Sequence, residues 1–419
     1  MRIDPASLSQ KEAETAARGC MAKFSTGRWF LIRCAELALL PLVRCVDFLR
    51  LPRREAQKKP ESILVIEGGQ LGDIALVLPF LQNLRLHYHG SRISLLANPK
   101  VFSLLENLEL VDELIPAEIP WIANSTRWGK YNPLSSQWAQ FARTLFHLCR
   151  RKFDLGLCAR ADIRDNFLLW LTGAKQRLGY AFYGGGFLLT STVTPDLNDL
   201  HYSSRWLRFL EHLEKGIVSR QPRLQLGPGE KSFAKEYFAN LGIEEDELVI
   251  GIHPGARIRT RQWGSNNFRA VGERLAAQLP VKILWFEDPN NASGDSPGGG
   301  IVPISLPLRQ FMAVLARCKL LICNDSGPMH IATALGVPVV AIFGPNKPEW
   351  FGPLGSKNRI VIHGGFWCRP CGDRCIFDQP YCLRTISTEE VFQAALDLSA
   401  SALPVHCGEK HEQSDGTAA

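Results

Sequence analysis

A short polar turn between two apolar runs is the part of this sequence best suited to bind an anion. The turn Asn324–Gly327 follows the apolar run Leu320–Cys323, and a helix-like stretch and a second apolar run, Val337–Phe343, come after it. This order predicts a strand, a turn, a helix and another strand. The first N–H groups of a helix lack partners and carry partial positive charge, which suits a phosphate. Asp325 and Ser326 are also preferred helix N-caps, so an ordinary cap explains the same residues.

A glycine-rich turn earlier in the chain has a similar setting. The turn Glu67–Asp73 follows the apolar run Ile63–Ile66 and precedes a helical pattern over 74–88, after which the strand pattern Arg92–Leu96 begins. A strand, a turn, a helix and a strand in this order predict a βαβ unit. Asp73 therefore stands at the beginning of a predicted helix.

Strand and helix patterns alternate in two successive runs, the first from residue 62 to about 229 and the second from about 230 onward. Such alternation predicts two doubly wound, Rossmann-like α/β domains with parallel sheets. Ligands of such sheets bind at the carboxyl ends of the strands. Those ends carry Gly68–Asp73, His253–Gly255 and Asn324–Gly327, so we expect the three segments to meet in one cleft between the domains.

Composition and pattern divide the chain into four parts. We expect a basic, amphipathic helical extension over 1–60, a first Rossmann-like domain over 61–229, a second over 230–400 that includes a cysteine-rich segment at 368–382, and a disordered tail over 401–419. Hydrophobic residues make up 46% of the chain and charged residues 21%, which is typical of a globular protein. The tail is polar and short of apolar residues, as disordered segments are.

The positive charge is concentrated near the N-terminus. The net charge is +7, and residues 1–60 hold 12 Lys and Arg against 6 Asp and Glu, so the rest of the chain is nearly neutral. A basic terminus on a neutral body indicates an anionic surface nearby. It argues against a nucleic-acid partner, because that function favours a basic stripe on the folded domain itself.

The stretch Trp29–Leu51 has the pattern of an amphipathic helix. Its charged residues fall within an arc of about 120° and leave a broad apolar face opposite. The longest uninterrupted apolar run, Leu37–Val43, is too short for the roughly 20 residues of a membrane span, and charges interrupt any signal-peptide core. A basic flank, Arg53–Lys59, follows. We predict that the helix either anchors on anionic lipid or packs on the protein's own body. The charges in the arc are Arg33, Glu36, Arg44, Asp47 and Arg50.

Four of the twelve cysteines cluster in the spacing Cys-x2-Cys-x3-Cys-x6-Cys, while others, such as Cys158, lie in apolar runs. The scattered ones are typical of reduced core thiols in an intracellular protein. Four thiolates so close together suit a tetrahedral structural Zn or Fe site, with no open position for catalysis. Redox-labile free thiols and two disulfides are the alternatives. The clustered residues are Cys368, Cys371, Cys375 and Cys382.

Four stretches together resemble glycosyltransferase family 9, the heptosyltransferases of lipopolysaccharide core assembly. They are Ile63–Pro79 with its Gly-x-x-Gly-Asp, Ile250–Trp263 with its His-Pro-Gly, Asn324–Gly344, and the cysteine segment. The resemblance implies a GT-B fold, with the acceptor on the first domain and the donor on the second. It implies inverting transfer of a heptose from ADP-heptose to a lipid-linked core oligosaccharide without a metal. With the N-terminal helix, it implies a cytoplasmic enzyme that is peripheral on the inner membrane.

Inverting transfer needs a base that takes the proton of the acceptor hydroxyl. Asp73 matches the family's catalytic aspartate, although capping of the following helix explains it as well. Without a metal, cations and helix N-termini must stabilise the departing diphosphate. Arg261 matches the family's phosphate-contacting basic residue, and Arg257 and Arg259 could share its role, with a solvated loop as the alternative for all three. His253 is either a ligand group or an ordinary strand-end histidine. The expected donor-binding residues are His253, Gly255, Arg261, Asp325, Ser326, Gly327, His330 and Glu287.

The sequence departs from the family pattern at two places. Glu67 stands where members commonly have a basic residue, and Glu287-Asp288-Pro289 stands where Gly-Gly-Pro is usual. The second loop usually leads to an acidic residue that contacts the ribose, and Asn291 falls near that place. Another nucleotide-sugar donor is therefore an alternative. A non-catalytic nucleotide-binding or metal-binding scaffold, and a redox or metal sensor centred on the cysteines, are the others.

Overall fold

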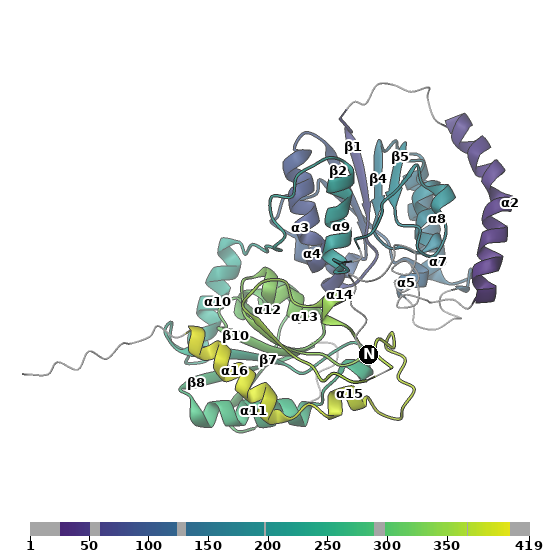
Figure 1. Cartoon of the computed structure of the whole chain (residues 1–419). Coiled ribbons are helices and arrows are strands. Elements are labelled where there is room, and N and C mark those ends of the chain that lie inside the picture. Colours follow the sequence, from purple (N-terminus) through teal and green to yellow (C-terminus); the bar gives the residue numbers. More distant parts are fainter. Residues whose placement is uncertain are drawn as a thin grey trace, which may run out of the picture.

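The computed structural model describes residues 26–50, 59–123, 131–196, 198–288, 298–366 and 368–402. Within them the chain forms two six-stranded sheets with the orders β3-β2-β1-β4-β5-β6 and β12-β11-β10-β7-β8-β9, each with helices on both faces (Figure 1). The first sheet contains β1 (Ser62–Ile66), β2 (Arg92–Ala97), β3 (Glu113–Pro116), β4 (Leu155–Cys158), β5 (Gln176–Gly179) and β6 (Ser191–Thr192). The second contains β7 (Leu248–His253), β8 (Val281–Glu287), β9 (Ile301–Ser305), β10 (Leu320–Asn324), β11 (Val339–Ile342) and β12 (Asn358–Val361).

The neighbouring strands pair in parallel, so each connection crosses the sheet through a helix or loop. Around the first sheet lie α3 (Leu71–His87), α4 (Phe102–Leu105), α5 (Pro120–Ala123), α7 (Ser136–Cys149), α8 (Ile163–Leu171) and α9 (Tyr202–His212). Around the second lie α10 (Pro228–Asn240), α11 (Ser265–Gln278), α12 (Leu308–Leu315), α13 (Gly327–Ala334), α14 (Pro348–Phe351), α15 (Tyr381–Arg384) and α16 (Thr388–Ala402). The predicted pair of doubly wound domains is confirmed.

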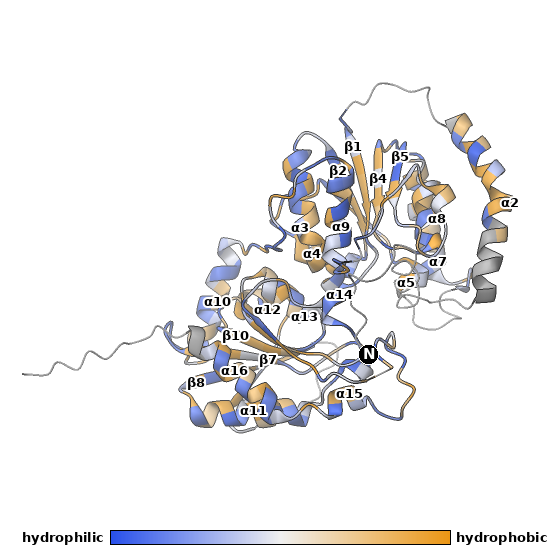
Figure 2. Cartoon of the chain, viewed as in Figure 1, coloured by the Kyte–Doolittle hydropathy of each residue, from blue (hydrophilic) through white to orange (hydrophobic). Residues whose placement is uncertain are grey.

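The central strands are short apolar runs because helices cover both of their faces. All five residues of β10 are buried, as are four of the five in β1. Figure 2 shows these strands in orange at the middle of each domain, with bluer residues on the outer helices. The sheets therefore form rigid platforms whose carboxyl ends can hold polar turns in fixed positions.

The strand order places two of the predicted turns at topological switch points. β1 continues to β2 on one side, whereas β4 lies on its other side. In the same way β7 continues to β8, whereas β10 lies on its other side, so the strand order reverses at β1 and at β7. Ligands of open α/β sheets bind where the order reverses, because the turns there diverge and leave a crevice. The turn Glu67–Asp73 follows β1, and His253–Gly255 lies at the end of β7. The fold thus explains why chemistry-bearing residues gather at these two strand ends.

The two domains meet where the N-terminal ends of α3 and α13 contact each other. A Cβ added to Gly72 would lie 3.0 Å from the His330 ring and 3.4 Å from the Cα of Gly327. A Cβ added to Gly327 would lie 3.5 Å from the backbone nitrogen of Gly72. Glycine at position 72 lets the helix ends approach this closely, whereas a Cβ at position 327 would make an ordinary van der Waals contact. A second contact across the domains joins His201 Nε2 to the carbonyl of Gly352 at 3.1 Å.

The predicted N-terminal helix corresponds to α2 (Thr26–Arg50), which runs along the edge of the first domain (Figure 1). Val43 of α2 packs with Trp170 and Leu188 in a small apolar cluster. None of the helices in the described ranges is long and apolar enough to cross a membrane. The basic residues at 53–58 and the predicted disordered tail from 403 onward lie outside the described residues.

We predict that Gly72→Val weakens the contact between the two domains. The larger side chain would overlap the His330 ring, and overpacking of this kind typically costs about 1–3 kcal/mol. Small-angle X-ray scattering should show a more open particle and thermal unfolding a lower midpoint. Gly90→Val is the matched control, because no atom lies within 4 Å of a Cβ at Gly90. Equal behaviour of the two variants would contradict the proposed packing.

Candidate active site

The turn after β1 holds two carboxylates at the carboxyl end of the first sheet. Asp73 lies in the first turn of α3, and its Oδ2 accepts a hydrogen bond from the N–H of Gln70 at 2.7 Å. Glu67 Oε1 accepts one from the N–H of Gly69 at 2.8 Å. A Cβ on Gly69 would lie 2.4 Å from Asp73 Oδ2, so only glycine leaves room for the carboxylate. One oxygen of Asp73 therefore caps α3, and its other oxygen makes no hydrogen bond to the described residues.

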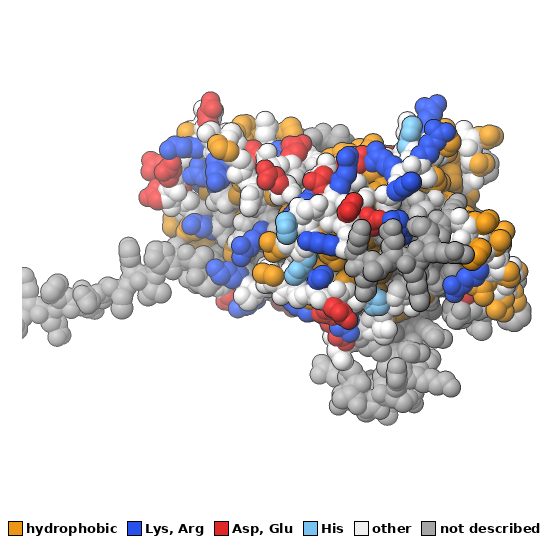
Figure 3. Space-filling model, turned by 90° about the horizontal axis from the view of Figure 1, so that it is seen from above, with side chains coloured by type: hydrophobic (Ala, Val, Ile, Leu, Met, Phe, Trp, Pro, Cys, Tyr) orange, Lys and Arg blue, Asp and Glu red, His pale blue; other side chains and the backbone are white. Residues whose placement is uncertain are grey.

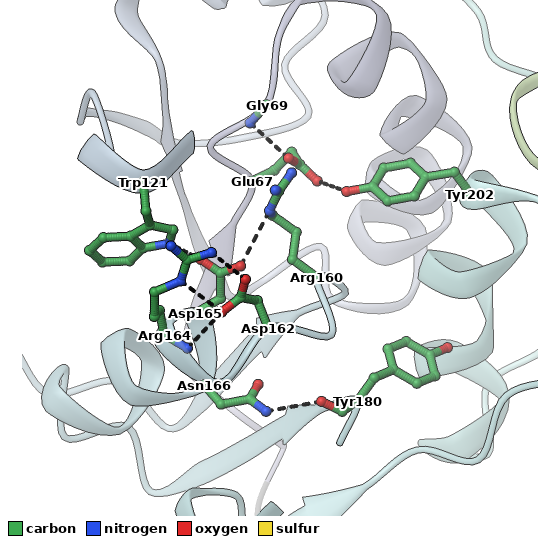
Figure 4. A network of polar contacts seen from close by, with 10 residues as sticks. All are labelled: Glu67, Gly69, Trp121, Arg160, Asp162, Arg164, Asp165, Asn166, Tyr180 and Tyr202. Atoms are coloured by element: carbon green, nitrogen blue, oxygen red, sulfur yellow. Dashed lines mark hydrogen bonds and ion pairs between the residues drawn. The ribbon is translucent and has the colours of Figure 1, made fainter. Parts of the chain in front are cut away.

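Glu67 lies in a buried polar network (Figure 4). Its side chain is fully buried, and its carboxylate accepts a hydrogen bond from the hydroxyl of Tyr202 at 2.5 Å. The guanidinium of Arg160, just beyond β4, points toward Glu67 in Figure 4 and pairs with Asp165 at 3.3 Å. Asp165 also accepts a hydrogen bond from Trp121 Nε1 at 2.7 Å.

Burial controls the protonation of this network. Loss of solvation, together with the negative charge of Asp73, raises the pKa of Glu67 from 4.5 to about 7, against the opposing effect of Arg160. Desolvation acts to lower the pKa of Arg160, but the charges of Asp165, Tyr202, Glu67 and Asp73 together outweigh it and raise that pKa above its ordinary value. Arg160 therefore stays a cation, and Glu67 is able to carry a proton near neutral pH while it lies beside Asp73.

Arg261 supplies a fixed cation on the second domain. Its Nε and Nη2 donate to the two carboxylate oxygens of Asp373 at 2.7 and 2.6 Å, and its Nη1 lies 3.4 Å from Asp325. The bidentate pairing fixes the plane of the guanidinium. Burial acts to lower the pKa of Arg261, but Asp373, Asp325 and, from the other domain, Asp73 raise it above its ordinary value. Arg261 is therefore an oriented charge within electrostatic reach of Asp73.

The N-terminus of α13 lies beside this cation. Ser326 occupies the N-cap position, yet its side chain makes no cap hydrogen bond to the helix. Its hydroxyl donates instead to the carbonyl of Asn324 at 3.3 Å. The buried Asp325 accepts a hydrogen bond from Asn346 at 2.5 Å and is turned toward Arg261. The sequence left an ordinary side-chain cap as an alternative, and the structure shows that Ser326 does not make one.

Two neutral histidines flank the helix end. His253 ends β7 and His330 lies in α13, and the Nδ1 atom of each is buried without a hydrogen-bond partner in the described ranges. Desolvation lowers the pKa of His253 to about 4 and that of His330 to about 3. Both rings are therefore uncharged at neutral pH. A buried nitrogen without a partner is costly, which favours a polar ligand or water at each ring.

The structure brings the predicted segments together at the contact between the domains. Gly72 lies against Gly327 and His330. The positive charge of Arg261 contributes to the lowered pKa of His330. The negative charge of Asp73 contributes to the raised pKa of Arg261. The segments after β1, β7 and β10 thus face one region, as expected from the strand ends.

The remaining predicted donor residues lie on the neighbouring strand ends. A Cβ on Gly255 would lie 3.0 Å from the His253 ring, so glycine permits this tight turn. Glu287 is the last residue of β8. The negative charge of the adjacent Asp288 acts to raise the pKa of His253, against the larger effect of desolvation. Asn291, which falls near the expected ribose contact, lies outside the described residues.

Sequence reasoning missed several residues of this site. Arg160 follows β4 by two residues, and the strand-end rule could have singled it out. Tyr202 and Asp373 gave no such signal, because they reach Glu67 and Arg261 from segments 135 and 112 residues away. Their roles depend on tertiary contacts that no local pattern encodes.

The predicted structural metal site has no support in the structure. The four clustered cysteines are free thiols that line one pocket, but no three His, Cys, Asp or Glu side chains in the described ranges are arranged to hold a metal ion. The positive charge of Arg369 acts on the Cys382 thiol, so a cation already lies near one of the four sulfurs. Burial raises the pKa of Cys371 and of Cys382, which favours protonated thiols over thiolate ligands. The predicted alternative of two disulfides is also wrong for this structure.

The family model for glycosyltransferase family 9 (heptosyltransferase) matches residues 141–380, which is more than half of the chain. The chain belongs to this family. It is 37% identical over 340 residues to lipooligosaccharide heptosyltransferase 2 of Campylobacter jejuni, covering 78% of this chain and 96% of that one. It is 23% identical over 322 residues to lipopolysaccharide heptosyltransferase 2 of Escherichia coli, covering 72% and 87%. The protein is therefore a glycosyltransferase, and the resemblance seen in the sequence is confirmed.

Solved structures support the fold of this glycosyltransferase. A family 9 glycosyltransferase from Veillonella parvula aligns with a TM-score of 0.67 at 23% identity, covering 83% of this chain and all of that one. The ADP-heptose lipopolysaccharide heptosyltransferase II of E. coli aligns with a TM-score of 0.61 at 20% identity, covering 81% and 99%. The expected GT-B architecture is confirmed.

We predict that Glu67 makes the stability of this glycosyltransferase depend on pH. Its folded-state pKa of about 7 exceeds the ordinary 4.5, so the folded protein binds the proton more tightly than the unfolded chain. The stability that this group contributes is therefore fully present below about pH 4.5 and is lost as pH rises through 7, by about 3 kcal/mol at most.

Urea unfolding at about pH 5 and about pH 8 measures this effect. Glu67→Gln should reduce the difference between the two conditions, because its amide cannot ionise. Glu236→Gln, at an exposed position of α10, is the control and should behave like the wild type. If Glu67→Gln keeps the wild-type pH dependence, the proton does not reside on Glu67.

Proposed function

We propose that this glycosyltransferase moves a heptose from ADP-heptose to a lipopolysaccharide core oligosaccharide, with inversion and without a metal. The observation that carries the proposal is the meeting of the Asp73 carboxylate with the uncapped N-terminus of α13 and the fixed guanidinium of Arg261. The first group suits a base and the other two suit a diphosphate. The heptosyltransferase names of the relatives support the donor and acceptor classes.

Asp73 acts as the general base in the proposed reaction. An acceptor hydroxyl oxygen attacks the anomeric carbon of the donor sugar, and Asp73 takes the hydroxyl proton. The bond between the anomeric carbon and the diphosphate oxygen breaks as the new glycosidic bond forms, so ADP leaves with the electron pair. The hydrogen bond from Gln70 to Oδ2 holds the carboxylate in place and leaves its second oxygen for the acceptor proton.

Charge on the departing diphosphate is stabilised by the second domain. The N–H groups at the start of α13, beyond Ser326, carry partial positive charge, and Arg261 adds a full one. His330 and His253 are neutral and supply hydrogen bonds rather than charge. Together these groups take the part that a divalent cation plays in metal-dependent transferases, which supports a metal-independent reaction.

We assign the acceptor to the first domain, at 61–229, and the donor to the second, at 230–400. Asp73 lies on the first and the diphosphate-binding groups lie on the second, which supports this division. Glu287 at the end of β8 is the candidate for the ribose contact. We place the reaction at the cytoplasmic face of the inner membrane, where a lipid-linked acceptor is reached. Another nucleotide-sugar is the second candidate donor, because Glu287-Asp288-Pro289 departs from the family pattern.

We predict that Asp73→Asn separates catalysis from capping. The amide oxygen of the new side chain still accepts the Gln70 N–H, so α3 starts normally, but an amide cannot take the acceptor proton. Release of ADP from ADP-heptose in the presence of heptose-deficient core acceptor should fall by about 100- to 10,000-fold. Donor affinity, measured by calorimetry, should stay near that of the wild type.

The controls for this experiment are Asp246→Asn, at an exposed position, and addition of EDTA to the wild type. Both should leave turnover unchanged. Loss of donor binding in Asp73→Asn would assign Asp73 a structural role, and loss of turnover with EDTA would overturn the metal-independent reaction. Turnover with a different nucleotide-sugar, and none with ADP-heptose, would select the second candidate donor.

We predict that Arg261→Lys weakens donor binding. Lysine keeps the charge but cannot pair with both oxygens of Asp373, so the cation loses its fixed orientation. The KM for the donor should rise by about tenfold, which corresponds to about 1.4 kcal/mol. Arg359→Lys is the control, because Arg359 is exposed on the edge strand β12 and is assigned no part in donor binding. Equal KM values in the two variants would remove Arg261 from the donor site.

A further inference from the structure

Helix α2 packs on the first domain with its two acidic side chains facing inward. Glu36 is buried, and its Oε1 accepts a hydrogen bond from the N–H of Gly185 at 2.5 Å. Asp47 accepts hydrogen bonds from Trp170 Nε1 at 3.1 Å and from the guanidinium of Arg177 at 2.6 Å. Both acidic residues of the helix are thus bound to its own domain, Glu36 in the middle part of the helix and Asp47 near its C-terminal end. These contacts fix the rotation of α2 about its axis.

The opposite side of α2 is apolar and faces outward. Leu37 is 72% exposed, Phe48 is 83% exposed and Leu49 is 77% exposed, values unusual for large apolar side chains. Arg44 is the one charged residue among the exposed positions of α2 that the structure describes. The other exposed positions of that group are Cys34, Leu37, Ala38, Leu39, Pro41, Leu42, Cys45, Phe48 and Leu49.

A further exposed aromatic side chain lies on α8, next to a residue that contacts α2. Phe167 of α8 is 47% exposed and stacks on Trp170, which is bound to Asp47 of α2. Figure 3 shows hydrophobic side chains gathered at the right-hand edge of the molecule, where α2 lies, with Lys and Arg side chains beside them. We call the exposed apolar residues of α2, together with Phe167, the α2 face. A contiguous exposed apolar surface of this kind marks an interaction site.

The charges on and near α2 indicate which partner binds the α2 face. Because Glu36 and Asp47 are turned inward and paired, no acidic side chain of the described part of α2 points outward. The exposed Arg44 lies on this side, and residues 1–60 carry 12 Lys and Arg against 6 Asp and Glu. The helix is not long and apolar enough to span a bilayer. An apolar helix face that carries an exposed arginine, in a segment of net positive charge, fits the headgroup region of an anionic bilayer.

We propose that the α2 face docks on an anionic lipid bilayer, with α2 lying parallel to the membrane plane. Leu42, Phe48 and their neighbours enter the boundary between headgroups and acyl chains, and cationic side chains contact the headgroups. Because the polar side of α2 is bound to the first domain, the face is presented before any membrane is met. The inference rests on the proposed function in one respect, which is that the acceptor is linked to lipid. It does not depend on the identity of the donor.

Vesicle co-sedimentation of the full chain tests the proposal. The wild type should bind vesicles of phosphatidylethanolamine and phosphatidylglycerol, bind phosphatidylcholine vesicles much less, and be released by high salt. Leu42→Asp combined with Phe48→Asp should weaken binding at least tenfold, because two charges would enter the apolar boundary. Thermal unfolding should not change, since both side chains are exposed.

Val218→Asp is the matched control, because Val218 is 71% exposed on the first domain but lies outside the α2 face. It should bind vesicles like the wild type. Unchanged binding in the double variant, or no binding by the wild type, would overturn the proposal. A wild-type dimer that ignores vesicles and becomes a monomer in the double variant would assign the face to a second copy instead. Failure of ADP-heptose turnover would leave the vesicle result untouched, so the two proposals fail separately.

Discussion

The close approach of two helix N-termini is the constraint on which the site depends. α3 and α13 come from different domains, and their first turns touch at Gly72 and Gly327, where a Cβ on Gly72 would press on the His330 ring. Both helix ends carry partial positive charge, so their contact creates a region that favours an anion. Asp73 lies in the first turn of α3 at this contact. The geometry therefore places the proposed base beside the proposed diphosphate-binding groups.

The charges around this contact are balanced by buried partners rather than by solvent. Arg261 is fixed by Asp373 and Asp325, and Arg160 is fixed by Asp165. Glu67 is the exception, because desolvation and Asp73 together favour its protonated form. A basic residue at that position, as is common in the family, would place a second cation beside Arg160. The chain instead places an acid there and takes its cation from the end of β4.

The sequence was sufficient to predict the two doubly wound sheets and the meeting of the polar turns at their strand ends. β1, β7 and β10 are apolar runs that end in polar turns, and the strand-end rule alone placed Asp73, His253 and the α13 turn at one region. The same rule could not find Asp373, because the cysteine segment has no strand or helix period and its meeting with Arg261 is tertiary. Cysteine spacing also misled, since four thiols that share a pocket do not by themselves adopt the arrangement of metal ligands.

Helix α2 shows that an amphipathic pattern does not determine which face of a helix packs on the protein. The pattern separates a charged arc from an apolar face, but it does not say which side meets the protein. Soluble helices usually bury the apolar side, and here hydrogen bonds from Gly185, Trp170 and Arg177 bury the acidic side instead. Those bonds stabilise an orientation that leaves large apolar side chains exposed, and covering them with another surface would add the free energy of their burial. The two predicted alternatives, lipid and protein, are therefore compatible, because the helix has two faces and the structure assigns the polar one to the protein.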